Sequence, residues 1–432
     1  MTYVAADKYL VDHGKLGFVI TKSLFQSELG GWHFRAFKLP DGVPLGLTIV
    51  DDFERVKPFK GQAANNTVTM LLEKGKVTEY PIPWKAHRPK QRRQQIAEDA
   101  TREEAIAAIT TRDWTARPVD TSDHQSALIS GEPAIVDILV PLLGSSPYGP
   151  LAREGINTRG ANGVYFLDAA EVHGRLLVVN RADDGDDRSL PARQQTLESE
   201  LVYPLIKGAD VHRWLASPSA YVLLPHVASA PNSPVAFAQL PAKTQEFLSA
   251  FRRKLESRTS FRNFDPSGSE WYGLYSVLTA TFSPVKVVWR EQARGSIAAV
   301  VEGAAVPTSS HKLIVPDNKL LIIPLESVDE ANFVCAMLNS SISAYLIRSY
   351  ALSTGISTHI LERLPIPRYQ RRIPAHEKIA QFGRQIASLA RTATPDQIAE
   401  AEHELDVAVG KLFGLSKHDV NLVRIALADL DQ

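Results

Sequence analysis

Hydrophobic and polar residues alternate in different ways along the chain. Over residues 3–11 the apolar positions have helical spacing, and short apolar runs rich in β-branched residues follow at 16–20, 45–50 and 66–72. Short runs of this kind between turn residues are typical of buried strands. Residues 1–84 are therefore predicted to form an α/β unit that contributes the closing strands of a sheet.

The pattern changes at Lys85, where the chain becomes highly charged, and we expect residues 85–124 to form a charged helical linker. From 125 to 328, short apolar runs recur between Pro and Gly residues, as in RLLVVN, VKVVW and KLLIIP. They predict a β-rich domain of mixed topology, interrupted by one helix over 240–258. Helical spacing returns over 329–432 and predicts a helical C-terminal region.

The composition is that of an ordinary globular protein. The 432 residues suffice for two or three domains at about 150 residues each. Lys plus Arg and Asp plus Glu both number 48, so the zero net charge excludes a histone-like polycation but permits a local basic face. The single cysteine, Cys335, excludes a disulfide framework and a cysteine-rich zinc site. Because the sequence has neither a membrane-length apolar run nor a signal-peptide core, we expect a cytoplasmic protein without membrane contact.

No short catalytic motif is present in the sequence. The chain has no Walker A sequence, no GxGxxG, no HExxH and no paired CxxC, and it predicts no metal site. Asp317 and Lys319 form an Asp-x-Lys pattern and Asp51 ends a predicted strand, but a turn and a strand end are the favoured explanations. A hydrolase built from acids that are far apart in sequence stays open as one interpretation.

Positive charge is concentrated in three segments, although the whole chain is neutral. These segments are 85–93, 251–262 and 364–372. Each can be a solvated face. Together with aromatic residues such as Trp271 and Tyr369, they favour a nucleic-acid surface on which Lys and Arg contact phosphates.

A more specific signal lies in the order of several longer stretches. Residues 15–75, from KLGFVITKSLF to NNTVTMLLEKG, resemble the C-terminal half of the catalytic domain in adenine-specific DNA methyltransferases of the type IIG restriction–modification branch. NTRGANGVYFL, ELVYPLIKGADVHRW, WYGLYSV and LNSSISAYLIRSYALSTGISTHILERLPIPRY look like the target-recognition domain of that family. ELDVAVGKLFGLSKHDVNLV resembles its helical tail. The resemblance covers most of the chain.

The resemblance implies an α/β fold with a partial methyltransferase sheet, followed by a mixed, β-rich target-recognition domain and a C-terminal helical region. Residues 1–84 would be the C-terminal half of a Rossmann-like methyltransferase domain, and 125–328 would recognise DNA. The chain lacks the family's Gly-rich loop for S-adenosylmethionine and its (Asp/Asn)-Pro-Pro-(Tyr/Phe) motif, which holds the extruded adenine. We therefore expect no S-adenosylmethionine binding and no methyl transfer by this chain alone.

A motif-bearing N-terminal half would supply these functions, either as a separate chain or as a part lost by truncation. If that half exists, an exposed strand edge near residues 16–20 is expected to complete its sheet. S-adenosylmethionine would then be bound only through the missing half.

The resemblance also implies individual site residues. Phe59 stands where the family places an aromatic ring that stacks on the flipped base, with packing as the alternative. Asn65 and Asn66 line the pocket or turn the chain, and Lys57 and Lys60 are within reach of phosphate. Candidates for DNA contact in the recognition domain are polar residues of loops and strand ends, namely Arg159, Arg290, Arg294, Ser309, His311, Lys312, Ser353 and Thr354.

The sequence thus predicts the DNA target-recognition part of an adenine-specific DNA methyltransferase from a restriction–modification or phage-defence system. Double-stranded DNA and the missing N-terminal half would be its partners. The alternative is a non-catalytic DNA-binding specificity module that acts as an adaptor for other effectors.

Overall fold

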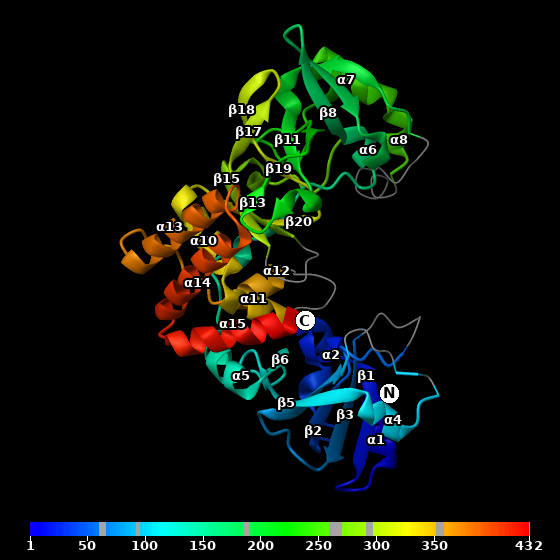
Figure 1. Cartoon of the computed structure of the whole chain (residues 1–432). Coiled ribbons are helices and arrows are strands. Elements are labelled where there is room, and N and C mark those ends of the chain that lie inside the picture. Colours follow the sequence, from blue (N-terminus) through cyan, green and yellow to red (C-terminus); the bar gives the residue numbers. More distant parts are fainter. Residues whose placement is uncertain are drawn as a thin grey trace.

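The computed structural model describes residues 1–59, 66–91, 96–97, 99–184, 190–258, 270–290, 297–350 and 358–431. Two sheet-bearing regions stand apart, and the C-terminal helices join them along one side (Figure 1). An α/β unit, a β-rich region and a helical end follow one another along the chain, which confirms the predicted fold class. The last helix ends beside the N-terminal region (Figure 1).

The N-terminal region is built on a six-stranded mixed sheet of order β1-β3-β2-β4-β5-β6. Neighbouring strands are antiparallel except β2 and β4, which are parallel. The strands are β1 (Lys15–Thr21), β2 (Leu45–Asp52), β3 (Thr67–Lys74), β4 (Ile82–Pro89), β5 (Ile109–Pro118) and β6 (Leu128–Gly131), and the helices are α1 (Thr2–Tyr9), α2 (Ser23–Gln26), α3 (Glu28–Trp32) and α4 (Arg102–Ala107). The rings of Phe25 and Trp84 pack edge to face at 5.6 Å in its core, which fixes α2 against β4.

This sheet extends further along the chain than the sequence predicted. The expectation of a helical linker over 85–124 is wrong for most of that range, because β4 continues to Pro89 and β5 pairs with it along its whole length. Only α4 is helical within the described part of the range. Ile82, Trp84 and Ala86 are buried in alternation, so the apolar side of β4 holds the strand in the sheet despite its charged neighbours. β6 carries the sheet beyond residue 125, where the β-rich domain was expected to begin.

The strand β1 lies at the edge of this sheet. It pairs with β3 from Lys15↔Glu73 to Thr21↔Thr67, and no described strand pairs with its other side. Val19 in the middle of this strand is 54% exposed. A strand edge therefore lies where the sequence predicted one.

Two sheets and two hairpins make up the described β-rich region. The larger sheet has the order β10-β9-β8-β14-β11-β19, the smaller one has the order β16-β15-β20-β7, and β12–β13 and β17–β18 are hairpins. The strands are β7 (Arg153–Glu154), β8 (Phe166–Val172), β9 (Arg175–Asn180), β10 (Gln194–Leu197), β11 (Val202–Ile206), β12 (Val211–His212), β13 (Leu215–Ala216), β14 (Ala220–Leu223), β15 (Val285–Arg290), β16 (Ala298–Val301), β17 (Gly303–Val306), β18 (Ser309–Leu313), β19 (Val315–Pro316) and β20 (Leu320–Leu325).

Short helices accompany these strands, namely α5 (Pro133–Leu139), α6 (Asn162–Tyr165), α7 (Ala242–Ala250) and α8 (Arg252–Glu256). α7 and α8 form the helical insert predicted over 240–258. Phe247, Leu248 and Leu255 are buried in the core of the larger sheet, which explains their helical spacing in the sequence.

The helical end comprises α10 (Val328–Asn339), α11 (Ser341–Tyr350), α12 (Thr358–Arg363), α13 (Pro374–Leu389), α14 (Pro395–Leu412) and α15 (Lys417–Asp431). α10 and α11 are separate helices, because Ser340 between them has extended backbone (φ −64°, ψ 151°). α10 and α13 approach closely at Gly383, where a Cβ atom would lie only 2.6 Å from the carbonyl oxygen of Asn332.

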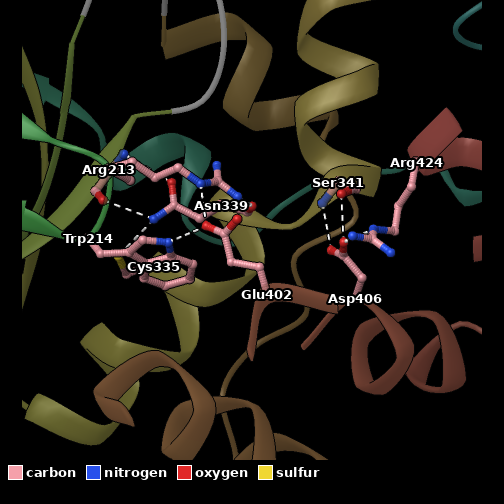
Figure 2. Close-up of polar contacts among 9 residues, drawn as sticks. Arg213, Trp214, Cys335, Asn339, Ser341, Glu402, Asp406 and Arg424 are labelled. Carbon is pink, nitrogen blue, oxygen red and sulfur yellow. Dashed lines mark hydrogen bonds and ion pairs between the residues drawn. The ribbon is translucent and has the colours of Figure 1, made fainter. Parts of the chain in front are cut away.

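Polar contacts tie the β-rich region to the helical end (Figure 2). Glu402 on α14 accepts hydrogen bonds from Arg213 Nε at 2.6 Å and from Trp214 Nε1 at 2.5 Å. The side-chain amide of Asn339 on α10 makes two hydrogen bonds to the backbone of Ala298, in the pattern of a neighbouring β-strand. Its Oδ1 accepts from the backbone N–H at 3.1 Å and its Nδ2 donates to the backbone carbonyl at 2.9 Å.

Two buried groups beside these contacts are structural. Burial raises the pKa of Cys335 to about 12, so the thiol stays protonated and packs as an apolar side chain. Burial also raises the pKa of Asp406, which accepts from the backbone N–H and the hydroxyl of Ser341 at 2.8 and 2.6 Å (Figure 2). Asp406 therefore links α14 to the first turn of α11, and Cys335 belongs to the apolar core around α10.

Candidate nucleic-acid interface

Three strands of the first sheet end at the same edge. β1, β2 and β4 run in one direction, since β3 is antiparallel to β1 and β2, and β4 is parallel to β2. Their last residues are Thr21, Asp52 and Pro89. Ligands of open α/β sheets bind outside the carboxyl ends of strands. This carboxyl edge is therefore the first part of the candidate site.

A buried ion-pair network joins the strand ends at the carboxyl edge. Lys22 Nζ lies 2.7 Å from Asp52 Oδ2 and 2.8 Å from Glu54 Oε2, and Trp84 Nε1 donates to the same Asp52 oxygen at 3.0 Å. Burial alone would lower the pKa of Lys22, but the charges of Asp52 and Glu54 raise it. Burial would raise the pKa of Asp52, but Lys22 lowers it. Both groups are therefore charged at neutral pH.

A second group of contacts fixes His87 at the same edge. Asp51 Oδ1 lies 2.8 Å from His87 Nε2, and Thr111 Oγ1 lies 2.9 Å from His87 Nδ1. The Phe53 ring stacks on the imidazole with centroids 4.6 Å apart and an angle of 14° between the planes. The imidazole is held through both nitrogens and one face, so it is a firm support for Phe53.

A turn begins at Phe53 and leads toward the predicted base-stacking residue. The Phe53 carbonyl accepts from the N–H groups of Val56 and Lys57, both at 3.0 Å, and Lys57 has a left-handed backbone with φ +51°. Phe59 follows two residues later and is 53% exposed, so core packing does not explain its ring. Lys22 N donates to the Asn66 carbonyl at 2.8 Å, which places Asn66 at the carboxyl edge. Lys60 and Asn65 lie outside the described residues.

Several arginines contact the C-terminal end of α15 beside this edge. Arg88 Nη1 lies 2.9 Å from Asp429 Oδ2, and Arg112 contacts the same oxygen. The Leu430 carbonyl accepts hydrogen bonds from the side chains of Arg55 and Arg348. Cations at a helix C-terminus are stabilised by the helix dipole. Because Arg55 lies in the turn after β2, α15 holds this turn from a second side.

The candidates in the recognition region lie in different parts of it. Arg159 is exposed, has φ +53°, and its guanidinium carbon lies 5.2 Å from the ring centroid of Tyr275. Arg290 ends β15, is half-buried and donates to a backbone carbonyl at 3.4 Å. Ser309 and His311 belong to β18, and His311 is exposed. Three candidates lie outside the described residues, namely Arg294, Ser353 and Thr354.

Two basic residues of the recognition region, Lys312 and Arg258, use their side chains for contacts within the chain. Lys312 donates to three backbone carbonyls of the 199–202 turn, and its Nζ lies 4.7 Å from the ring centroid of Tyr203. Its three N–H groups are used, which leaves none for a phosphate. Arg258 is 5% exposed and donates to four backbone carbonyls. Neighbouring Arg253 on α8 is exposed and is the better phosphate candidate in the 251–262 segment.

Sequence reasoning missed the residues that organise the carboxyl edge. Lys22, His87 and Arg55 each meet a partner from another element of the fold. The available signal was the pair Asp51 and Asp52 at a strand end. It does not reveal the partners of these residues, because the partners lie 30 or more residues away.

Acidic residues form no metal centre in the part of the chain that is described. No group of three or more His, Cys, Asp or Glu residues there is placed to hold a metal ion. Asp317 lies in the predicted turn, where its Oδ1 accepts from the Lys319 N–H at 3.1 Å, and burial raises the pKa of Asp317 to about 6. None of the described helices has the length and apolar character needed to cross a membrane.

Comparison with known proteins gives a fold relationship. No protein-family model matches the chain, and no curated protein matches its sequence. The structure is similar to that of the type IIL restriction–modification enzyme MmeI in complex with DNA, with a TM-score of 0.51 and 12% identity over 96% of this chain and 50% of MmeI.

Two weaker matches belong to the same class of enzymes. The type IIG restriction endonuclease BpuSI matches with a TM-score of 0.31 and 11% identity over 98% of this chain and 48% of its own. A nuclease-deletion mutant of the type ISP enzyme LlaGI, in complex with a DNA substrate mimic, matches with a TM-score of 0.37 and 11% identity over 89% of this chain and 30% of its own. The chain therefore has a fold found within a type IIL restriction–modification enzyme and spans about half of that enzyme's length.

Proposed function

We propose that this chain is the DNA target-recognition part of an adenine-specific DNA methyltransferase in a restriction–modification or phage-defence system. The observation that carries the proposal is the fold likeness to MmeI, which extends over 96% of this chain and comes from a complex with DNA. On this proposal double-stranded DNA is the partner. The β-rich region reads the sequence, and the first sheet helps to seat the extruded adenine.

The carboxyl edge supplies one side of the base pocket in this proposal. Phe59 is exposed, Lys57 precedes it by two residues, and Asn66 accepts from the Lys22 N–H at the same edge of the sheet. An aromatic ring stacks on an unpaired base with about 1–3 kcal/mol. The Lys22 network and the contact of Arg55 with α15 hold the turn that precedes Phe59 from two sides. The position of the Phe59 ring is therefore supported by the rest of the fold.

We infer that this chain alone does not bind S-adenosylmethionine at the carboxyl edge. The Lys22–Asp52 ion pair joins the ends of β1 and β2 there, and the sequence has no Gly-rich turn that leads from one of these strands into a helix. We assign the methyl donor and the motif that holds the adenine amino group to a further half of the protein. In this assignment a strand of that half pairs with the open side of β1.

Binding and transfer assays test the proposal. The chain alone is expected to bind a fluorescent DNA duplex with an affinity that falls as salt rises, because phosphate contacts release counterions. Calorimetry is expected to detect no S-adenosylmethionine binding to the chain alone. Adding the product of the upstream gene is expected to give transfer of a labelled methyl group to adenine.

Three outcomes would contradict it. Micromolar S-adenosylmethionine binding by the chain alone would refute the assignment of the methyl-donor site to a further half of the protein. A DNA affinity that does not change with salt concentration would indicate a protein partner instead. Plasmid cleavage that needs a divalent metal and is lost in Asp317→Asn or Asp51→Asn would favour a hydrolase.

A further inference from the structure

The C-terminal helices border an open hollow that the proposed function does not use. Residues of α13, α14 and α15 line it, and its volume is about 580 Å³. Part of its wall is apolar and is formed by Phe382, Val407 and Ala408. Small-molecule sites typically have volumes of about 300–1,000 Å³. The size and the wall therefore suit a small organic ligand.

Three lysines from three different helices line this hollow. Lys378 belongs to α13, Lys411 to the last turn of α14, and Lys417 is the first residue of α15. Across the described chain, none of the three forms an ion pair with a carboxylate, and Lys378 Nζ instead lies 5.6 Å from the Phe382 ring centroid. Glu404 is the acidic residue of the lining, so three lysines and one glutamate give a net charge of +2. A concave surface of one sign concentrates ions of the other.

Two polar groups near the three lysines have partners of their own. Asp419 on α15 accepts from the N–H and the hydroxyl of Ser416 at 2.9 and 2.7 Å, so its carboxylate caps the helix. Arg424 contacts Nδ1 of His403, another lining residue.

We propose that this hollow binds a nucleoside polyphosphate of the ATP type. Three ammonium groups around one hollow favour a ligand with several negative charges, and the apolar wall beside Phe382 favours a flat organic group. A nucleoside triphosphate has both within one compact molecule. The phosphates contact Lys378, Lys411 and Lys417, and the base packs against Phe382 and its apolar neighbours. The inference does not depend on the proposed role in DNA recognition.

Calorimetry on the full chain with ATP, ADP and inorganic tripolyphosphate, without divalent metal, tests the proposal. ATP is expected to bind more tightly than ADP and more tightly than tripolyphosphate. Lys411→Ala and Lys417→Ala are each expected to weaken ATP binding by at least about tenfold, which is the loss of one charge-assisted hydrogen bond. Phe382→Ala is expected to weaken ATP binding without changing that of tripolyphosphate. Lys76→Ala, at an exposed lysine in the turn after β3, is the control and is expected to change nothing.

Thermal unfolding of each variant separates lost binding from lost folding, and the two lysine variants at exposed positions are expected to melt as the wild type does. The proposal is overturned if ATP does not bind at millimolar concentration. It is also overturned if tripolyphosphate binds as tightly as ATP, or if Lys76→Ala weakens binding as much as Lys411→Ala does. Displacement of ATP by duplex DNA together with a smaller salt dependence of DNA binding in Lys411→Ala would replace it with a DNA backbone contact.

Discussion

Lys22 Nζ lies 2.7 Å from Asp52 Oδ2, and the two side chains are only 7% and 4% exposed. The lysine follows β1 and the aspartate ends β2, so one ion pair joins two strand ends that are separated by β3. Burying a charge is costly unless its partner is present. The carboxyl edge therefore depends on both residues together.

Removing one partner of this pair is expected to destabilise the fold strongly. Lys22→Met leaves the Asp52 carboxylate buried without its cation and should reduce the free energy of unfolding by about 3–5 kcal/mol. The double variant Lys22→Met with Asp52→Asn should lose less, because the carboxylate that remains, that of Glu54, is 35% exposed and reaches water. Urea unfolding followed by circular dichroism measures both. Lys15→Met is the control, since Lys15 is 60% exposed and lies 4.0 Å from Glu73, and equal losses in the single and double variants would refute the coupling.

The buried Lys286 is expected to make stability depend on pH. It donates to the carbonyls of Ser283 and Ile314 at 2.6 and 3.1 Å, and burial lowers the pKa of Lys286 to about 7. Between this value and its unfolded value of 10.5, the unfolded chain binds more protons than the folded chain, so stability rises with pH. The total rise is up to about 5 kcal/mol, and below pH 7 this contribution is constant.

Denaturant unfolding of the wild type and Lys286→Met between pH 6 and pH 10 checks the pH dependence. The variant should show a smaller rise than the wild type across this range. If the rise persists unchanged in Lys286→Met, another group is its source.

Asp429 is expected to control how firmly α15 is attached to the first sheet. Asp429→Asn removes the carboxylate shared by Arg88 and Arg112 and should reduce stability by about 1–3 kcal/mol, since these groups are only partly exposed. Hydrogen exchange should become faster at the end of α15 and in the turn that contains Arg55. Asp137→Asn is the control, because Asp137 is 60% exposed in its pair with Arg117. Unchanged exchange would show that α15 is held by apolar packing alone.

Phe59→Ala is expected to weaken binding to unpaired adenine without weakening the fold. The ring is 53% exposed, so its loss should leave the melting temperature within the range of surface variants. Stacking of about 1–3 kcal/mol corresponds to a loss of about 5- to 150-fold in affinity for a single-stranded oligo-adenylate. Anisotropy titrations measure it, with Val77→Ala at a 65% exposed position as the control. An unchanged affinity would remove Phe59 from the proposed base pocket.

Arg253→Ala is expected to reduce the salt dependence of DNA binding by about one unit in the slope of log K against log salt. Arg253 is exposed on α8, so its loss should not change stability. Lys76→Ala, in the turn at the opposite edge of the first sheet, should leave the slope unchanged. Equal slopes for the wild type and Arg253→Ala would exclude a phosphate contact there.

The sequence was sufficient for the order of the three structural classes and for several individual elements. Apolar spacing correctly located β1, the α7–α8 insert and the C-terminal helices, because each buries one side against a core. Apolar spacing failed over 85–124. The alternation of Ile82, Trp84 and Ala86 begins just before this range, and the charged residues that follow concealed its continuation as a strand. Charge alone does not exclude a strand whose other face is buried.

The candidate site was predicted less completely than the fold, because one-dimensional patterns do not reveal partners. Lys312 and Arg258 look like DNA contacts in sequence, yet each donates to backbone carbonyls inside the chain. Lys22 and His87 give no signal in sequence, and they organise the carboxyl edge. The roles of Phe59, Lys57, Asn66, Arg159 and Arg290 in DNA binding stay predictions.

The helix α15 has its two ends in different environments. Its 15 residues span about 22 Å, from Lys417 at the hollow to Leu430, whose carbonyl receives Arg55. An α-helix is stiff along its axis, so α15 rigidly connects the hollow with the turn that precedes Phe59. Any influence of a ligand in the hollow on DNA affinity would be matched by an equal influence of DNA on that ligand.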